Sequence, residues 1–414
     1  MRAVLISTGT ELLLGDVQEA HLAFIAREIF EFGLRIQEHR VVPDGPTIRN
    51  ALIDLFPHAE IVFVTGGLGP TTDDITRETV AELLDLQLMC DNGVLSAIKE
   101  RLVKRSIRLT DRIQRQACVP AGAQVLPNEN GTAPGLYLRS NINPAIPSPH
   151  LFVLPGPPRE LRPMFHNSVK AILSTIVQVP PASNRRFYRI AGMGESLVEE
   201  AVGEKILAIP GIELGYCARP GQVDLRIIGE NAAIEQAHAI ITSKLGNFIY
   251  STGSESLEEV VVKLLAKRKE TIVLAESCTG GLLAHRITNV AGASAVLIAG
   301  YTAYSNEAKI DLLSVDSQLI EQHGAVSESV ARTMAEGARK RAQSTHALAT
   351  TGIAGPTGGS PEKPIGTVYI ALASSDDETL VKRFFFPSDR ETFKQLTAQT
   401  AFELLRQRIM KRDS

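Results

Sequence analysis

The chain is poor in cysteine and has no cysteine pattern that suits a metal. Its 414 residues include only four cysteines, at positions 90, 118, 217 and 278. No two of them have the Cys-x-x-Cys spacing that zinc sites and redox motifs use. Neither a zinc cage nor a disulfide framework is therefore expected, and a reducing cytoplasmic environment is the default.

Long apolar runs and blocks of one charge sign are also missing. The N-terminus reaches polar residues after four apolar ones, too early for a signal peptide, and the uncharged stretch 287–306 is broken by Asn, Gly, Ser and Thr residues. The 43 Lys and Arg against 46 Asp and Glu give a net charge of -3 without a polybasic arm. We therefore predict a soluble, cytoplasmic protein that binds neither membranes nor nucleic acid.

The length predicts two to three domains, and the composition, with 44% hydrophobic and 21% charged residues, is that of a globular protein. Over residues 1–175, short β-branched runs alternate with amphipathic stretches, which predicts an α/β domain with a mostly parallel sheet and ligands beyond the strand ends. A Pro/Ser/Asn seam at 180–184 precedes a small α+β domain at 182–250. A second α/β domain is expected at 254–414.

A strand that ends in a sharp turn marks the first candidate site. The apolar run 271–275 is followed by Glu-Ser-Cys-Thr-Gly-Gly and then by a helical pattern. A hydroxyl residue on such a turn is expected to be exposed, near a helix N-terminus and surrounded by free N–H groups that could hold an oxyanion. Ser277 is thus a candidate nucleophile. The alternative is that Ser277 or Thr279 only caps the helix.

Two further segments could complete this site. Tyr304 ends a strand and Lys309 lies one turn into the next helix, so a Lys with a pKa lowered by burial could activate Ser277 directly or through the Tyr hydroxyl. Alternatively, Tyr304 is an edge of the core and Lys309 a solvated charge. The glycine-rich loop 352–359 could approach an anion closely, or be an ordinary turn. Arg390 is a candidate anion clamp.

Six segments in order resemble the C-terminal domain of the competence/damage-inducible CinA family. They are AESCTGG (275–281), TAYSNEAK (302–309), HGAVSES (323–329), TTGIAGPTGG (350–359), KPIGTVYIA (363–371) and FFFPSDR (384–390). The resemblance implies an α/β domain that deamidates nicotinamide mononucleotide without a cofactor. It implies that Ser277, Tyr304 and Lys309 are catalytic and that Cys278 only packs. It implies substrate contacts from Thr279, Gly280, Gly352, Ala354, Gly355 and Arg390.

The second candidate site follows a strand near the N-terminus. Val62–Thr65 leads into Gly-Gly-Leu-Gly-Pro-Thr-Thr-Asp-Asp at 66–74 and then into a helix. A glycine turn with a Thr pair before a helix can hold phosphate, and carboxylates beside it suit a metal ion. It is not a Walker loop, because the Gly-Lys-[Ser/Thr] ending is absent. The alternative is that Asp73 and Asp74 cap the helix and that Asp44 is a turn residue.

The N-terminal half resembles the molybdopterin-binding-like half of the same family through the segments 8–11, 42–44, 65–74, 116–136 and 154–165. The resemblance implies a three-layer fold and metal-dependent hydrolysis of ADP-ribose to AMP and ribose 5-phosphate. Asp44 and Asp74 would hold a divalent cation such as Mg²⁺, alone or with a monovalent cation. The implied substrate contacts are Gly9, Glu11, Thr65, Gly66, Gly67, Gly69, Thr71, Thr72, Pro155 and Gly156.

One position departs from the family, and one activity has an alternative. Relatives usually carry Asn where this chain has His21, so the N-terminal site is weakened if that Asn contacts the ligand or the metal. The N-terminal half could also bind a nucleotide or pterin as a sensor without turnover. The leading hypothesis is a two-activity enzyme of pyridine nucleotide salvage.

The middle segment resembles the family's KH-like domain. Residues 181–250 hold seven Lys and Arg against eight Asp and Glu and have no GXXG loop, whereas a nucleic-acid-binding KH module would show that loop and a basic face. We therefore expect a spacer or dimerisation element, and a homodimer.

Overall fold

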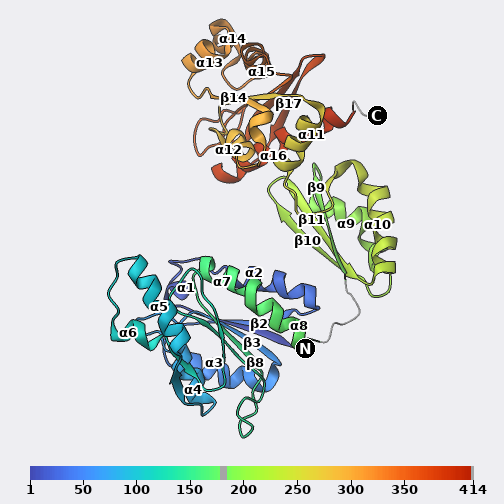
Figure 1. Ribbon diagram of the computed structural model, residues 1–414. Helices are drawn as coiled ribbons and strands as arrows, with labels where there is room; N and C mark the ends of the chain where they lie inside the picture. The colour runs from blue at the N-terminus through green and yellow to red at the C-terminus, as the bar shows by residue number, and fades with distance from the viewer. Residues whose placement is uncertain (178–183, 412–414) are drawn as a thin grey trace. The chain divides into compact units, whose positions relative to one another are not determined.

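The computed structural model describes residues 1–177 and 184–411, and Figure 1 traces the chain. The predicted seam at 180–184 lies outside the described residues except for Asn184. Contacts divide the chain into two units, Met1–Ala182 and Ser183–Ser414. The middle segment therefore belongs with the C-terminal part, and each unit is described by itself.

The first unit is built on a six-stranded sheet in the order β2-β1-β3-β8-β7-β6. The first four strands run parallel, and β7 and β6 continue the sheet antiparallel. The prediction of a mostly parallel sheet is thus confirmed. The strands are β1 (Ala3–Thr8), β2 (Ile36–Val42), β3 (Ile61–Thr65), β6 (Gln124–Leu126), β7 (Gly135–Leu138) and β8 (His150–Leu154).

Helices cover both faces of this sheet, which makes three layers (Figure 1). Strand residues alternate between two cores: Leu5 and Phe63 pack with α2 and α7, while Ile6 and Val64 pack with α3 and α4. The covering helices are α2 (His21–Ile29), α3 (Thr47–Leu55), α4 (Thr76–Leu83), α7 (Pro158–Met164) and α8 (Lys170–Ile176). The remaining elements are α1 (Thr10–Leu14), β4 (Leu88–Cys90), α5 (Asn92–Lys104), α6 (Asp111–Arg115) and β5 (Cys118–Pro120).

The middle domain opens the second unit. Its antiparallel sheet has the order β10-β11-β9-β12, and both helices pack on one face through a core that includes Tyr188, Val198 and Ile241. Its elements are β9 (Asn184–Ala191), α9 (Glu195–Leu207), β10 (Glu213–Arg219), β11 (Gln222–Gly229), α10 (Asn231–Leu245) and β12 (Ile249–Ser251). The short strand β12 pairs with β9 at the edge of this sheet, and the α+β composition predicted for the domain is confirmed.

The C-terminal domain has a five-stranded sheet in the order β14-β13-β15-β16-β17. The strands are β13 (Ile272–Glu276), β14 (Leu297–Thr302), β15 (His346–Gly352), β16 (Thr367–Ser374) and β17 (Asp377–Phe385). The helices are α11 (Leu257–Arg268), α12 (Leu282–Thr288), α13 (Asn306–Leu313), α14 (Ser317–His323), α15 (Glu328–Ala342) and α16 (Arg390–Lys411). The pair β16 and β17 forms an antiparallel hairpin.

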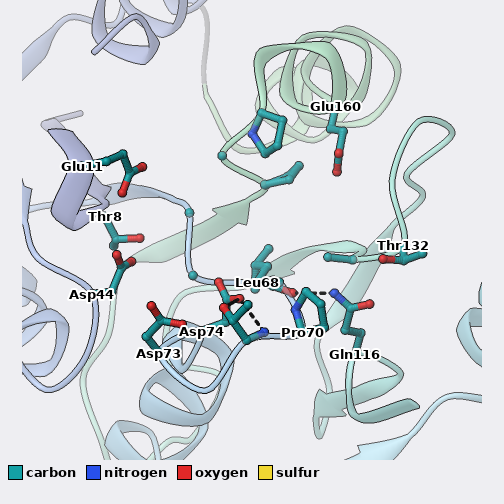
Figure 2. A pocket seen from close by; sticks show the side chains of 18 residues that line it. Thr8, Glu11, Asp44, Leu68, Pro70, Asp73, Asp74, Gln116, Thr132 and Glu160 are labelled. Carbon is teal, nitrogen blue, oxygen red and sulfur yellow. Dashed lines mark hydrogen bonds between the residues drawn. The ribbon is translucent and has the colours of Figure 1, made fainter. Parts of the chain in front are cut away.

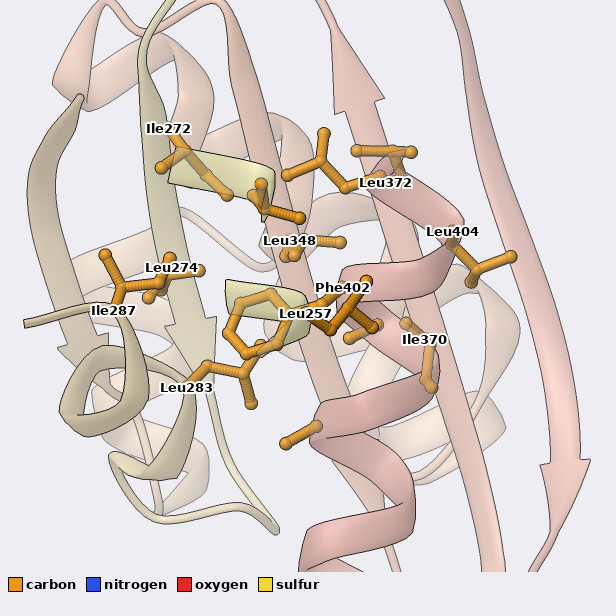
Figure 3. Packing of buried hydrophobic residues seen from close by; sticks show 14 of the residues in the cluster. Leu257, Ile272, Leu274, Leu283, Ile287, Leu348, Ile370, Leu372, Phe402 and Leu404 are labelled. Carbon is orange, nitrogen blue, oxygen red and sulfur yellow. The ribbon is translucent and has the colours of Figure 1, made fainter. Parts of the chain in front are cut away.

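Apolar side chains pack on both faces of this five-stranded sheet. Figure 3 shows Leu283 of α12 and Phe402 of α16 packed against Leu274 and Leu348 of the strands, while α15 covers the opposite face. The result is that the turn after β13 is held rigidly at the carboxyl end of the central strands. Within residues 1–177 and 184–411, no helix is both long and apolar enough to cross a membrane.

Candidate functional site

A cavity of about 430 Å³ lies where β1, β3 and β8 of the first unit end (Figure 2). The carboxyl ends of parallel strands are where open α/β sheets bind their ligands. Of the predicted residues, the cavity is lined by Glu11, Asp44, Gly66, Gly67, Gly69, Thr71, Asp74, Pro155 and Gly156. The cavity therefore brings together most of the residues predicted for this site.

Two glycines of the loop need their lack of a side chain. Gly66 has φ +99° and Gly67 has φ +65°, a region that favours glycine. A Cβ at Gly66 would overlap the Thr8 hydroxyl, and one at Gly67 would overlap the Thr76 hydroxyl. Close backbone packing onto β1 and α4 thus shapes the floor of the cavity.

Three predicted contacts do not line the cavity. The side chain of Thr65 is fully buried and hydrogen-bonds to His21 Nδ1 at 2.9 Å and to Ser7 Oγ at 3.3 Å. Gly9 instead ties the turn after β1 to β2 through its N–H, which donates to the Val42 carbonyl at 3.1 Å. Thr72 is exposed on the outside of the loop. A local sequence motif does not show which way each side chain turns, and that direction decides which residues line the cavity.

The lining is acidic. Its carboxylates are Glu11, Asp44, Asp73, Asp74 and Glu160, and no Lys, Arg or His belongs to the residues that line the cavity. Asp44 Oδ2 accepts from the Thr10 N–H at 2.9 Å and Asp74 Oδ2 from the Thr71 N–H at 3.0 Å. The Thr71 hydroxyl also lowers the pKa of Asp73 through a hydrogen bond. An anion entering here meets no cationic side chain.

The capping alternative for Asp73 and Asp74 is wrong, because α4 has Ile75 at its N-cap and no side-chain cap bond. In the described part of the chain, no three His, Cys, Asp or Glu side chains come together as a complete metal centre. Mg²⁺ is commonly held by one or two carboxylates together with substrate phosphates and waters. The pair Asp44 and Asp74 fits that mode of binding and does not fit an all-protein cage.

His21 lies behind the wall of the cavity and does not line it. Its Nε2 is 2.6 Å from the Gly156 carbonyl oxygen and its Nδ1 is 2.9 Å from Thr65 Oγ1. The Gly156 carbonyl can only accept, so His21 Nε2 carries a proton and donates to it. Gly156 lines the cavity, so His21 positions that wall.

Other lining residues were missed by sequence reasoning. They are Thr8, Leu68, Pro70, Gln116, Thr132, Ala133, Pro157 and Glu160, while Asp73 was considered only together with Asp74 as a carboxylate beside the loop. Several of them belong to segments that carry the resemblance, but no local pattern shows which side chains turn inward. Gln116 and Thr132 reach the cavity from elements far along the chain, where α6 ends and before β7.

In the C-terminal domain, Glu276 accepts hydrogen bonds from the start of α12. The capping alternative had given this role to Ser277 or Thr279. The buried carboxylate of Glu276 accepts hydrogen bonds from the N–H groups of Gly281, Leu283 and Ala284 at 2.9–3.0 Å. The N-cap of α12 is Gly281, without a side-chain cap bond. Capping by Ser277 or Thr279 is therefore wrong, and so is the expectation that these helix amides are free for an oxyanion.

Ser277 is less accessible than predicted. It is 8% exposed, because its N–H donates to the Thr350 carbonyl at 3.0 Å and so continues the sheet one residue beyond β13. Its side chain makes no hydrogen bond to any residue in the described ranges 1–177 and 184–411. In those same ranges, no oxygen atom accepts from the N–H of Cys278 or Thr279. These two amides are the N–H groups of the turn that the described residues leave without an oxygen acceptor.

Lys309 is buried, so the expectation of a solvated charge is wrong. It is 2% exposed, and its Nζ donates to the carbonyls of Ala303, Tyr304 and Ser305 at 3.0–3.3 Å. Burial lowers the pKa of Lys309 below its ordinary value, and the nearby Cys278 thiol has a smaller, opposite effect on that pKa. Burial favours the neutral amine that a Ser-Lys mechanism uses, whereas three carbonyl acceptors use the three N–H protons of the ammonium form.

The side chain of Tyr304 is exposed, so the alternative that it packs at an edge of the core is wrong. Its side chain is 61% exposed, and its hydroxyl accepts from Arg390 Nη2 at 3.0 Å, while Arg390 Nη1 donates to the Gly355 carbonyl at 2.8 Å. Arg390 thus connects the turn after β14 with the glycine-rich loop. Within the described residues, no hydrogen bond joins the side chains of Ser277, Tyr304 and Lys309 to one another.

The remaining predicted contacts differ in their accessibility. Gly280 is exposed in the turn, with φ +61°, whereas Gly355 and Ala354 are buried and Gly352 is partly buried at the end of β15. The Thr279 hydroxyl is fully buried and lies 2.8 Å from Thr350 Oγ1. The Thr279 side chain thus faces the interior, and a substrate contact at Thr279, which stays a prediction, would have to use its N–H.

Cys278 is next to Ser277 and is the other side chain of this turn that could act as a nucleophile. Its side chain is buried, and burial raises the pKa of the thiol to about 12. The thiolate is the nucleophilic form of cysteine, so a thiol with this pKa is inert near neutral pH. The assignment of Cys278 to packing agrees with its place in the core cluster.

Comparison with known proteins covers nearly the whole chain. Three family models match: a probable molybdopterin binding domain at residues 4–175, the damage-inducible protein CinA KH domain at 185–251 and the CinA C-terminal domain at 254–409. A CinA-like protein of Akkermansia muciniphila is 41% identical over 402 residues, covering 97% of this chain and 96% of the relative.

A second relative and a solved structure are also similar to this chain. A CinA-like protein of Kosmotoga olearia is 40% identical over 418 residues and 99% of each chain. The crystal structure of a competence/damage inducible protein from Agrobacterium tumefaciens is 36% identical over 37% of this chain and 97% of that chain, with a TM-score of 0.35. With one relative 41% identical over almost its full length, this chain belongs to the CinA family.

Proposed function

We propose that the chain is a bifunctional hydrolase of pyridine nucleotide salvage. Its C-terminal site would convert nicotinamide mononucleotide to nicotinic acid mononucleotide and ammonia, and its N-terminal site would split ADP-ribose into AMP and ribose 5-phosphate. The observation that carries the first activity is the buried Lys309 amine beside the turn that presents Ser277. The acidic cavity at the strand ends supports the second.

Deamidation would proceed through an acyl-enzyme. The Ser277 hydroxyl oxygen would attack the carboxamide carbon as its proton passes to the Lys309 amine. Lys309 would first lose a proton and give up one of its three carbonyl acceptors. The amides of Cys278 and Thr279 donate to the oxygen that becomes negative. The C–N bond then breaks, the leaving NH₂ takes the proton as ammonia, and water hydrolyses the ester to release the acid and restore Ser277.

The contacts of Tyr304 favour direct proton transfer between Ser277 and Lys309 over a relay. The Tyr304 hydroxyl is occupied by Arg390, and both side chains are exposed. Tyr304 and Arg390 therefore suit the recognition of the substrate's phosphate, since a guanidinium pairs well with phosphate oxygens. In this arrangement Tyr304 orients Arg390, and Lys309 alone acts as the base.

ADP-ribose carries a negatively charged pyrophosphate, and the lining of the N-terminal cavity carries five carboxylates. Such a ligand would bind with a divalent cation, which Asp44 and Asp74 would hold. The cation would offset the pyrophosphate charge and favour ionisation of a bound water. Gly67 and Gly69 would approach the phosphate oxygens through their backbone N–H groups, as glycine-rich turns do before a helix. The Gly66 N–H already donates to the Leu154 carbonyl, so Gly66 would only let the phosphate come close.

Product analysis tests both assignments on one preparation. Purified full-length chain is incubated separately with nicotinamide mononucleotide and with ADP-ribose, each with Mg²⁺ or with EDTA, and the products are identified by chromatography and mass. We expect deamidation in both conditions and ADP-ribose cleavage only with Mg²⁺. The Ser277→Ala variant should lose only the first reaction, and Asp44→Asn/Asp74→Asn only the second.

The same experiment separates hydrolysis from sensing. If ADP-ribose raises the melting temperature of the chain but yields no AMP with Mg²⁺ present, the N-terminal half binds nucleotides without turnover. Ligand binding alone stabilises the folded state by mass action and needs no chemistry. That result would remove the hydrolytic half of the proposal and leave the deamidase unaffected.

A further inference from the structure

Two free cysteines lie directly opposite each other on neighbouring strands of the first unit. Strands β4 and β5 form a separate two-stranded antiparallel sheet, in which Cys90 pairs with Cys118. Neither cysteine is part of a disulfide bond. The two positions are far apart in the chain, so their spacing does not indicate the pairing, and only the register of the strands shows it.

The pair occupies the kind of position that a cross-strand disulfide needs. The N–H of Asp91 donates to the Ala117 carbonyl at 2.8 Å, so the next pair along the ladder is a hydrogen-bonded one. Hydrogen-bonded and non-hydrogen-bonded pairs alternate in an antiparallel ladder, which makes Cys90 and Cys118 a non-hydrogen-bonded pair. The Cα atoms of such a pair are about 4.5 Å apart and the side chains share one face. Disulfide bonds join Cα atoms that are about 4.4–6.8 Å apart.

Both thiols lie on the accessible face of this small sheet. Successive residues of a strand point to opposite faces. Val119 is 7% exposed and packs in a core of the first unit, so Cys118 points to the other face, together with Cys90. Cys90 is exposed and Cys118 is partly exposed. An oxidant in solution can therefore reach one thiol, and the second thiol is positioned to react with the product.

We propose that Cys90 and Cys118 are an oxidation site that forms a reversible intramolecular disulfide when the chain meets a hydroperoxide. The exposed Cys90 thiolate attacks a peroxide oxygen, the O–O bond breaks, and a solvent proton completes the water that leaves a sulfenic acid on Cys90. The Cys118 sulfur then attacks the Cys90 sulfur, the S–O bond breaks, and the departing hydroxide takes the Cys118 proton to form a second water. In sum, two thiols lose two electrons and two protons, and hydrogen peroxide becomes two waters.

The bond would be local and reversible. It would join the two ends of the segment that carries α5 and α6, closing a loop of roughly 30 residues. The sheet at this point has only three residue pairs, and a two-stranded sheet is marginally stable by itself, so a covalent link would hold it together. A thiol reductant reverses the bond by exchange. Disulfides of this transient kind are the ones that reducing compartments contain.

Peptide mapping of the oxidised full-length chain tests the proposal. The reduced chain is treated with one equivalent of hydrogen peroxide, the remaining thiols are blocked with N-ethylmaleimide, and a tryptic digest is analysed by mass with and without dithiothreitol. Cys90 and Cys118 lie on different tryptic peptides. We expect these two peptides to be joined, two hydrogens lighter than their sum, and to separate in dithiothreitol. The denatured chain should fall from four reactive thiols to two and run as a single chain on a non-reducing gel.

Cys217 provides the matched control. It is also exposed, but the residue opposite it is Asp224 and not a cysteine. Cys217→Ser should give the same joined peptides as the wild type, whereas Cys90→Ser and Cys118→Ser should give none. A wild-type chain that yields only disulfides between chains, a bond to Cys217, or irreversible sulfinic acids overturns the inference. The wild-type map decides the matter even if a variant does not fold.

Discussion

Replacing Ser277 with alanine should abolish deamidation and leave the fold almost unchanged. The Ser277 side chain makes no hydrogen bond within the described residues, and the helix that follows is capped by Glu276. Losing such a hydroxyl should change the free energy of unfolding by less than about 1 kcal/mol. For a unit of this size, that corresponds to a melting-temperature change of at most about 4 °C.

The loss of activity should be of a different order. Removing a serine nucleophile typically lowers kcat by a factor of about a thousand or far more. Ammonia release from nicotinamide mononucleotide, measured with matched protein concentrations, reports this directly. Cys278→Ala is the control, because the raised pKa of the buried thiol makes it a poor nucleophile. It should retain substantial activity.

Glu276→Ala should show the converse pattern. It removes the acceptor of three N–H groups at the start of α12, and hydrogen bonds to charged groups contribute about 1.5–3 kcal/mol each, although they are not additive. We expect a destabilisation of about 3 kcal/mol or more, or a melting temperature lower by about 6 °C or more.

Two results would contradict the assignment of Ser277 as the nucleophile. A Ser277→Ala chain that still releases ammonia at the wild-type rate would refute it, and an inactive Cys278→Ala chain would move the assignment to the thiol.

Three further predictions concern the remaining groups. Burial lowers the pKa of Lys309 below its ordinary value of 10.5. The fraction of neutral amine, and with it kcat, should therefore rise with pH around that lowered pKa. A pH profile of Lys309→Met should lack this rise, and the variant should lose nearly all activity. Asp44→Asn/Asp74→Asn should abolish ADP-ribose cleavage and EDTA should do the same to the wild type, whereas full activity in EDTA argues against a metal. His21→Ala should raise KM for ADP-ribose and destabilise the first unit by about 1–3 kcal/mol, because the Gly156 carbonyl loses its donor; unchanged KM and melting temperature would contradict a positioning role.

The sequence predicted the parts of the fold that depend on local patterns. The period of the apolar residues located β3 at Ile61–Thr65, and the glycine run after it located the floor of the cavity. Glycines that need positive φ or close packing, such as Gly66 and Gly67, are visible in a sequence because no other residue fits.

What the sequence did not predict depends on contacts between distant segments. Gln116 reaches the cavity only because its amide bonds to Leu68, 48 residues earlier in the chain. Thr65 follows the expected motif, yet it turns away from the ligand to bond with His21. Ser277 was expected to be exposed, but the pairing of β13 with β15 extends past the strand and partly buries it. Burial and side-chain direction come from tertiary packing, which no local pattern encodes.

The most direct test of the account is the mass analysis of products from nicotinamide mononucleotide incubated with the full chain in EDTA. We predict nicotinic acid mononucleotide and ammonia in equal amounts, and neither product with Ser277→Ala. Release of free nicotinamide, or deamidation that requires added metal, would contradict a covalent serine mechanism at the end of β13.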